Sequence, residues 1–281
     1  MCKNLLILII IVVNCIGMMA WFGEGASNAE ISNNVKIKDT LEVIKEKRVL
    51  TVASANDIPF FYIDTQTKKI TGIDADILTE ISKRLGINKI EMKEISFSNI
   101  LEILNAENSI DVAVDGIYIT DEREKIVNFT EPLYKETESV VVPKFSAINF
   151  KSDLKTATVG VKNGTLFVEL AQKWKKGGLI KNIEIYENSF ELFNDINMGK
   201  IDAGITDSVV INNPSVNKNF SLRTLKDYTP ELPGHIGIAV IKEDTILLNA
   251  LNEKINEMKA DGTLYAILVD NGMGKNNMIV E

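Results

Sequence analysis

Residues 111–134, DVAVDGIYITDEREKIVNFTEPLY, carry the densest structural signals in this sequence. The run 111–114 predicts a short strand, and the Asp115-Gly116 pair that follows it favours a turn. Thr120 suits the N-cap of a helix, because its hydroxyl can accept a hydrogen bond from a backbone N–H of the first turn. The stretch therefore predicts a strand, a polar loop and a helix in quick succession.

Arg123 stands in the first turn of this predicted helix. Asp121 and Glu122 suit that turn, because acidic groups complement the helix dipole, whereas a cation does not. An anion held jointly by the guanidinium and the helix N-terminus would explain the arginine. The other interpretation is that Arg123 pairs with Glu124 or Glu131 on a solvated surface. The residue types alone leave both interpretations open.

One pattern occurs twice in the chain. Residues 96–116, SFSNILEILNAENSIDVAVDG, and 189–208, SFELFNDINMGKIDAGITDS, each run from Ser-Phe through an amphipathic helix to Ile-Asp, a short strand and a polar loop. Two such α/β units would each present the carboxyl end of a strand, which is where open α/β sheets bind ligands. The repeat predicts two lobes whose facing loops form a cleft, and it favours the anion site at Arg123.

The segment GIYITDEREKIVNFTEPLY resembles the signature of the family 3 extracellular solute-binding proteins, the amino-acid receptors of ABC importers. The resemblance covers most of residues 39–271. It includes, in order, RVLTVASANDIPFFY, GIDADILTEISKRLG, GVKNGT, GKIDAGITD, GIAVIKED and DGTLYAIL. It implies an α/β, two-lobed periplasmic-binding-protein fold, in which each lobe is a mixed sheet flanked by helices and a two-strand hinge lies beside a cleft.

The resemblance also implies how the chain is divided between the lobes. We expect residues 30–140 to form the first part of lobe one and residues 141–234 to form lobe two. Residues 235–281 would return to complete lobe one with C-terminal helices. The apolar strand at 140–143 would be one crossover, and 235–241 would be the other.

In this family the central loop and its arginine hold the α-carboxylate of the ligand. The resemblance therefore assigns the carboxylate to Arg123 and to the loop backbone at Gly116. Thr165, in a Gly-Thr pair at the start of a helix, would meet the same carboxylate from the second lobe, although such a pair is also a common N-cap. Asp207, at the end of the strand 201–206, would accept the α-ammonium, and it could equally cap the turn that follows.

The resemblance assigns two aromatic residues to the ligand's side chain. Phe60, which follows a Pro-fixed turn, and Phe97, in the loop before a helix, would pack on it from two sides. The alternative for the loop 60–62 is that two of its three aromatic residues belong to the core. Phe190 holds the position analogous to Phe97 in the other lobe, where we expect it in the core.

Three residues depart from the family pattern. Tyr118 stands where the family has a small hydroxyl residue, so it would either donate its phenol to the anion or narrow the pocket. Asp115 precedes Gly116 in the same loop. Asp57 stands where some relatives carry an aromatic residue, and an acid facing the cleft there would favour a cationic group on the ligand.

The first 29 residues are expected to be a signal peptide rather than part of the fold. Lys3 and the apolar run 5–13 are followed by a small-x-small site that favours cleavage after Ala29. The alternatives are lipidation at Cys15 and an uncleaved apolar anchor, and each of them still exports the chain to the periplasm or cell surface.

Composition excludes several kinds of chemistry. Both cysteines, Cys2 and Cys15, lie in the leader, so the mature chain would lack disulfides, thiolate catalysis and cysteine zinc sites. His235 is the only histidine, which leaves a histidine triad or metal site without companions. Asp74 and Asp76 are expected to cap a helix, because no further ligands follow at EF-hand spacing. We expect no cofactor and no metal.

The remaining bulk properties are those of a soluble two-domain protein. The 281 residues suffice for two hydrophobic cores, and the composition is 45% hydrophobic and 25% charged. The net charge of −8, without blocks of like charge, argues against nucleic acid or an anionic membrane surface as a partner.

The prediction for function is an exported, monomeric, non-enzymatic receptor that delivers a small amino acid-like ligand to an ABC permease. The alternative is a cyclohexadienyl dehydratase, because the chain also resembles these enzymes in its fold and in the central stretch. They use a carboxylate as general acid on prephenate or arogenate. Asp115, Tyr118 and Asp57 keep this alternative open. A detached sensor domain is a third interpretation, which the lack of a downstream kinase-like or transmembrane segment disfavours.

Overall fold

The computed structural model describes residues 40–279. The predicted signal peptide, its cleavage site after Ala29 and the lipidation alternative at Cys15 lie outside the described residues. Within residues 40–279, none of the helices combines the length and the apolar character that crossing a membrane requires.

The first of two five-stranded sheets has the strand order β4-β1-β5-β14-β6. Strand β1 runs parallel to β4 and β5, and β14 is antiparallel to β5 and β6. Leu50, Val52 and Ala53 of β1 are buried, as expected for a central parallel strand covered on both faces. The strands are β1 (Val49–Ser54), β4 (Lys89–Glu94), β5 (Val112–Ala113), β6 (Val127–Phe129) and β14 (Ala239–Ile241).

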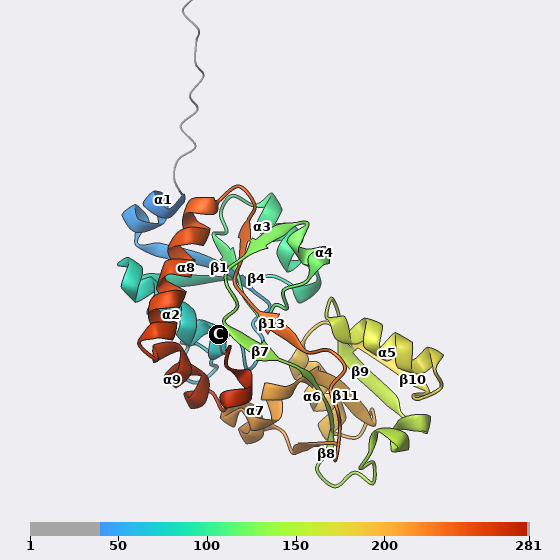
Figure 1. The fold of residues 1–281 in the computed structure, drawn as a ribbon. Coiled ribbons are helices and arrows are strands. Elements are labelled where there is room, and N and C mark those ends of the chain that lie inside the picture. Colours follow the sequence, from blue (N-terminus) through green and yellow to red (C-terminus); the bar gives the residue numbers. More distant parts are fainter. Residues whose placement is uncertain (1–39, 280–281) are drawn as a thin grey trace, which may run out of the picture. The chain divides into compact units, whose positions relative to one another are not determined.

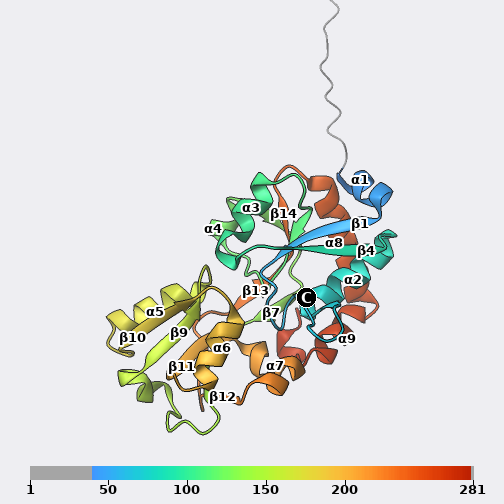
Figure 2. The same cartoon turned by 180° about the vertical axis from the view of Figure 1, so that it is seen from behind.

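Helices cover both faces of this first sheet (Figures 1 and 2). Three of them, α2, α8 and α9, pack together on one face, while α3 and α4 lie on the other. The apolar residues of α8 recur at three- to four-residue spacing, and all of those named here are buried: Leu247, Leu251, Ile255 and Met258. We call this assembly lobe one. Its helices are α1 (Thr40–Lys47), α2 (Ile73–Leu85), α3 (Ile100–Ala106), α4 (Asp121–Glu124), α8 (Thr245–Ala260) and α9 (Thr263–Asp270).

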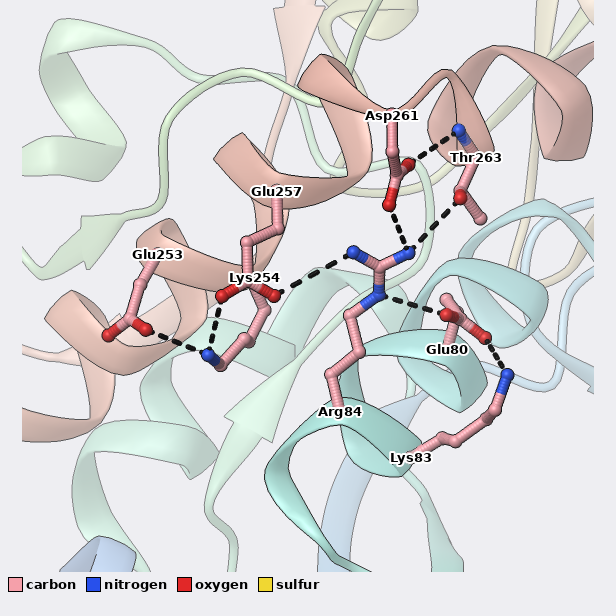
Figure 3. A network of polar contacts seen from close by, with 8 residues as sticks. All are labelled: Glu80, Lys83, Arg84, Glu253, Lys254, Glu257, Asp261 and Thr263. Carbon is pink, nitrogen blue, oxygen red and sulfur yellow. Dashed lines mark hydrogen bonds and ion pairs between the residues drawn. The ribbon is translucent and has the colours of Figure 1, made fainter.

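A polar network ties the C-terminal helices to α2 (Figure 3). The guanidinium of Arg84 contacts Glu80 on its own helix at 2.9 Å and Asp261, at the α8–α9 corner, at 2.8 Å. It also donates to the hydroxyl of Thr263 at 3.1 Å. Because the side chain of Asp261 is 48% exposed, such a pair contributes about 1 kcal/mol or less. The network fixes the position of the corner more than it adds stability.

The second sheet has the order β10-β9-β11-β8-β12 and is built from one continuous stretch of chain. Strand β9 is parallel to β10 and β11, and β8 is antiparallel to β11 and β12. We call this sheet and its helices lobe two. Its elements are β8 (Glu138–Pro143), η2 (Lys151–Thr156), β9 (Thr158–Lys162), α5 (Leu166–Lys176), β10 (Asn182–Tyr186), α6 (Ser189–Asn197), β11 (Ala203–Asp207), η3 (Ser208–Asn212), α7 (Pro214–Asn219) and β12 (Leu222–Thr224).

The two lobes are joined by a separate pair of antiparallel strands, β7 (Tyr134–Glu136) and β13 (Gly234–Ile236). The first crossing therefore precedes the predicted one at 140–143. That prediction was wrong because Val140, Val141 and Val142 are fully buried inside β8, so their apolar run marks a core strand. The return strand overlaps the predicted segment 235–241. The remaining short elements are β2 (Tyr62–Ile63), β3 (Ile70–Thr71), η1 (Phe97–Asn99) and η4 (Lys275–Asn277).

The repeated pattern of the sequence is confirmed as one structural unit used twice. In lobe one, η1 and α3 lead to β5, which pairs in parallel with β1. In lobe two, α6 leads to β11, which pairs in parallel with β9. The loops after β5 and β11 therefore extend from the carboxyl ends of central strands, where the sequence predicts the ligand site.

Asp74 has a different role from the predicted one. The N-cap position of α2 is Gly72, and no side chain caps the helix there. Asp74 is buried instead, and its carboxylate accepts hydrogen bonds from the N–H of Gly116 at 2.8 Å and the hydroxyl of Tyr134 at 2.9 Å. Burial raises the pKa of Asp74 to about 6. This carboxyl group joins the loop after β5 to β7.

Candidate functional site

A cavity of about 10 Å³ lies between the loop that follows β5 and the ends of β9 and β11. Residues of both lobes line it, including six of the eight predicted ligand-binding residues. The lining consists of Phe97, Asp115, Gly116, Tyr118 and Arg123 of lobe one and Lys162, Thr165, Leu166, Phe167 and Asp207 of lobe two.

Arg123 reaches the cavity from α4, whose N-cap is Thr120 as predicted. Its guanidinium donates to the carbonyl oxygens of Tyr118 at 2.8 Å and of Gly164, in the other lobe, at 3.1 Å. Within residues 40–279 it forms no ion pair, and Glu131 pairs with Lys259 instead. The surface-pair interpretation is therefore wrong. Burial lowers the pKa of Arg123, and the nearby Asp207 and then Tyr118 oppose this fall.

The ring of Phe97 contacts both cations that line the cavity, Arg123 and Lys162. The guanidinium carbon of Arg123 lies 5.6 Å from its ring centroid, and the ammonium of Lys162 lies 4.0 Å from it. Cation–π contacts of this kind are worth roughly 1–2 kcal/mol when desolvated. The ring is buried, and both positive charges lie over it.

Asp207 ends β11 and presents one carboxylate oxygen without a donor. Its Oδ1 atom is buried and has no hydrogen-bond partner among the residues that the structure describes. Burial and the nearby Glu136 raise the pKa of Asp207 well above its usual range, and Lys162 opposes this rise. A buried acceptor left unpaired costs about 1–3 kcal/mol. A cationic donor entering the cavity would remove that cost.

Tyr118 contributes a neutral phenol. Burial and the nearby Asp207 raise the pKa of Tyr118 well above its usual range, so the hydroxyl keeps its proton. The Oη atom is buried without a hydrogen-bond partner in the described part of the chain. Its ring packs edge-on against Phe167 with 6.2 Å between centroids. The bulky residue fills space that a small hydroxyl residue would leave.

Thr165 and Gly116 line the cavity with groups that are already bonded. The hydroxyl of Thr165 donates to the carbonyl oxygen of Lys162 at 2.7 Å. The N–H of Gly116 donates to Asp74 at 2.8 Å. The backbone at Gly116 has φ 64°, in the left-handed region that favours glycine.

Phe60 does not line this cavity. Its side chain is 2% exposed and packs behind Gly116, where a Cβ would lie 2.7 Å from the ring of Phe60. Phe61 and Tyr62 are buried as well. Phe190, expected in the core, is 59% exposed, and its ring packs edge-on against Phe220 with 5.5 Å between centroids. That expectation was wrong.

Lys162 and Asp57 form a buried ion pair between the lobes. Lys162 ends β9 in lobe two, and its ammonium contacts the Oδ2 atom of Asp57 in lobe one. Asp57 also accepts hydrogen bonds from the N–H of Ser189 at 3.3 Å and its hydroxyl at 2.9 Å. Burial alone would lower the pKa of Lys162, but Asp57 and then Asp115 raise it above its usual value.

Asp115 is the third buried acid near the cavity, after Asp207 and Asp57. It is fully buried, and its Oδ1 atom accepts a hydrogen bond from the hydroxyl of Ser54 at 2.9 Å. Its Oδ2 atom lies 3.7 Å from the ammonium of Lys162 and has no hydrogen-bond partner among residues 40–279. Burial raises the pKa of Asp115 well above its usual range, Lys162 opposes the rise, and Asp57 adds to it.

Sequence reasoning missed Lys162 as a site residue. The signal available was a charged residue at the carboxyl end of the apolar strand 158–162, within the quoted GVKNGT motif. What the sequence could not supply was its partner, because Asp57 is 105 positions away. No group of three or more His, Cys, Asp or Glu side chains in the described region could hold a metal ion.

Comparison with known families decides what this arrangement belongs to. The sequence model of the bacterial extracellular solute-binding proteins, family 3, matches residues 50–270. The chain is a family 3 bacterial extracellular solute-binding protein. Solute binding, rather than catalysis, is therefore the function of the chain.

Relatives with named ligands cover most of this solute-binding protein. It is 31% identical over 222 residues to a probable histidine-binding protein of Neisseria gonorrhoeae, covering 76% of this chain and 80% of that one. It is 29% identical over 266 residues to the ABC transporter glutamine-binding protein GlnH of Bacillus subtilis, covering 92% and 94%.

A solved structure confirms the fold. A mutant of ArgBP from T. maritima superimposes with a TM-score of 0.71 at 30% identity, covering 82% of this chain and 98% of that one. The predicted α/β periplasmic-binding-protein fold with two mixed sheets is therefore confirmed. The relatives are named for different ligands, so their names do not identify the solute of this solute-binding protein.

Proposed function

We propose that this solute-binding protein is the amino-acid receptor of an ABC importer. The observation that carries the proposal is a pair of unmatched charges lining one cavity from opposite lobes. Arg123 has no carboxylate partner in the described chain, and the Oδ1 atom of Asp207 has no donor there. An amino acid brings the two missing groups, because its α-carboxylate suits Arg123 and its α-ammonium suits Asp207.

The energies are sufficient for a transport receptor. Hydrogen bonds to charged groups contribute roughly 1.5–3 kcal/mol each, and micromolar affinity corresponds to about 8 kcal/mol. Three such bonds, from Arg123, Asp207 and the phenol of Tyr118, sum to roughly 5–9 kcal/mol, and burial of the ligand's apolar atoms against Phe97 and Phe167 adds to them to offset the cost of association.

The other predicted site residues take supporting roles in this proposal. Thr165 meets the carboxylate from lobe two, and Phe97 packs against the ligand beneath the two cations. Gly116 lets the loop pass close to Phe60, whose ring supports the loop from behind instead of stacking on the ligand. Asp57 acts through its pairing with Lys162 at the edge of the site.

Ligand contacts from both lobes couple binding to lobe closure. A solute that bridges Arg123 of lobe one and Asp207 of lobe two stabilises the closed arrangement about β7 and β13. We propose that an ABC permease recognises this closed arrangement. We also propose that the chain is exported as a monomer, through a leader cleaved after Ala29 or through lipidation at Cys15.

The test is a thermal-shift panel of the common amino acids on protein refolded after unfolding, so that bound solute is removed. A ligand at 100 times its dissociation constant adds about 2.7 kcal/mol, which raises Tm by roughly 5–10 °C for a chain of this size. Arg123→Ala should abolish the shift. Arg223→Ala is the matched control, because Arg223 also donates to carbonyl oxygens, at 2.8 Å to Ser146 and Ile148, but lies outside the cavity.

Two results would contradict this proposal. If Arg123→Ala keeps the shift in full, the carboxylate does not bind at Arg123. If the wild-type protein responds to prephenate and converts it, while no amino acid raises Tm, the dehydratase alternative replaces the receptor.

A further inference from the structure

Buried carboxylates outnumber cations around the cavity. The carboxylates are those of Asp57, Asp115 and Asp207, and the cations are Arg123 and Lys162. An amino acid's own α-carboxylate and α-ammonium add one charge of each sign, so they leave the excess unchanged. Buried charges are stable only when they are paired, so the ligand-free protein must hold a proton on one carboxylate, and burial raises the pKa of Asp115 accordingly. A positive charge on the ligand would take the place of that proton.

The position of the missing charge is given by Asp115. Its Oδ1 atom is bonded to Ser54, whereas its buried Oδ2 atom lacks a hydrogen-bond donor within the described residues. The unpartnered oxygens of Asp115 and Asp207 belong to two residues that line the same cavity. If Asp207 receives the α-ammonium, Asp115 still needs a second donor. The ligand's side chain is the part left to supply it.

Lys162 does not supply the donor that Asp115 lacks. Its ammonium bonds to Asp57, and it remains 3.7 Å from Asp115, beyond hydrogen-bond distance. A ligand carboxylate placed beside Lys162 would become the third carboxylate around a single ammonium. A ligand cation placed beside Asp115 would instead balance the charges of the site.

We propose that Asp115 and Asp57, with Lys162, form a subsite that selects amino acids with a positively charged side chain. The inference rests on the proposed function, because it assigns the ligand's α-groups to Arg123 and Asp207. Asp115 accepts an N–H of the side-chain guanidinium or ammonium, and Lys162 keeps Asp57 paired from the other lobe.

The division of the subsite between the lobes supports this assignment. Asp57, Asp115 and Arg123 all belong to lobe one, whereas Lys162 belongs to lobe two. When the lobes separate, Lys162 leaves with lobe two, and lobe one presents two carboxylates beside one guanidinium. A cationic amino acid matches that set with its side chain on the acids and its carboxylate on Arg123.

A second cavity lies beside Asp57. It has a volume of about 300 Å³ and is lined by Asp57, Tyr62 and Glu94 from lobe one and by Phe190, Phe193 and Phe220 from lobe two. The acid Glu94 and the aromatic faces of this cavity also suit a cation.

The experiment compares amino acids whose side chains differ in charge, by calorimetric titration of the refolded full chain. L-arginine is paired with L-citrulline, its nearly isosteric neutral counterpart, and L-lysine with L-norleucine; L-glutamate is the acidic member. We expect the cationic member of at least one pair to bind at least tenfold more tightly than its counterpart, and L-glutamate to bind more weakly than either.

Asp115→Asn should remove this preference, so that the charged and neutral members of a pair bind the variant with equal affinity. Asp111→Asn is the matched control, because Asp111 lies just before the same strand and accepts the N–H of Thr51 at 2.7 Å away from the cavity. Should Asp115→Asn fail to fold, the comparison of arginine with citrulline on the wild-type protein decides by itself.

Three results would overturn the inference. Equal affinities for the charged and neutral members, with binding lost in Arg123→Ala, would refute the cationic subsite and leave the amino-acid receptor intact. Tightest binding of L-glutamate, lost in Lys162→Met, would make Lys162 the receptor of a side-chain carboxylate. No binding of any amino acid would refute the proposed function and the inference with it.

Discussion

Among single residues, Gly116 and Phe60 are in such close contact that each restricts what the other position can hold. Gly116 has φ 64°, and a Cβ there would lie 2.7 Å from the ring of Phe60. We expect Gly116→Ala to lower the free energy of unfolding by roughly 2–5 kcal/mol, because left-handed strain adds to overpacking. Urea unfolding measures the change.

Gly86→Ala separates the two causes of that loss. Gly86 has φ 75°, and a Cβ there would meet no atom within 4 Å. Its substitution should therefore cost only the backbone strain, about 1–2 kcal/mol. Equal losses for the two variants would show that the contact with Phe60 does not constrain the loop.

Strand β7 places an acid inside the hinge. Glu136 is buried and accepts hydrogen bonds from the N–H groups of Thr137 and Ser208, each at 3.0 Å. Its Oε2 atom has no partner in the described chain. Burial raises the pKa of Glu136 from 4.5 to about 7, and the hydrogen bonds from Ser208 and Thr137 oppose the rise.

This pKa predicts a pH-dependent stability. Because the folded value exceeds the unfolded one, the stabilising contribution of Glu136 is complete below pH 4.5 and is lost as the pH rises through about 7. Glu136→Gln cannot ionise. We therefore expect the free energy of unfolding of this variant, relative to wild type, to rise by roughly 2 kcal/mol between pH 5 and pH 8. A difference that stays constant in urea titrations at both pH values would contradict it.

Across the whole molecule, Gly164 sets how closely the lobes approach. It lies in the loop after β9, and a Cβ there would lie 2.6 Å from the Cα atom of Ser98 in lobe one. We expect Gly164→Ala to hold the lobes apart and to weaken ligand binding at least tenfold, as measured by calorimetric titration.

Gly178→Ala is the matched control for Gly164→Ala. Gly178 has φ 71°, close to the 76° of Gly164, but a Cβ there would meet no atom within 4 Å. The two variants should lose similar stability to backbone strain, whereas only Gly164→Ala should lose affinity. Unchanged affinity in Gly164→Ala would mean that closure does not bring these backbones together.

The sequence predicts most of the fold and part of the cavity. The repeated stretches 96–116 and 189–208 predict equivalent strands, since helix periodicity and turn residues are local signals. Six of the proposed contacts line one cavity, and four of them, Gly116, Tyr118, Arg123 and Asp207, lie at the ends of those strands or after them. Their roles toward the ligand stay predictions.

What the sequence does not predict depends on contacts between distant segments. Lys162 and Asp57 are 105 positions apart, and neither carries a local sign of its partner. Asp74 looks like a helix cap, because its bonds to Gly116 and Tyr134 depend on segments 42 and 60 positions away. The crossing at β7 was missed for a related reason, since the more apolar run at 140–143 satisfies the same strand criteria.

The strand order of lobe one has a consequence for biosynthesis. A chain grows from its N-terminus, and all the strands of the second sheet lie within residues 138–224, so that sheet can be completed while synthesis continues. In the first sheet, β14 separates β5 from β6, and it comprises residues 239–241. Lobe one, whose synthesis begins first, is therefore the last to be completed. More than a hundred residues must be synthesised after Arg123 before the sheet of its lobe can be complete.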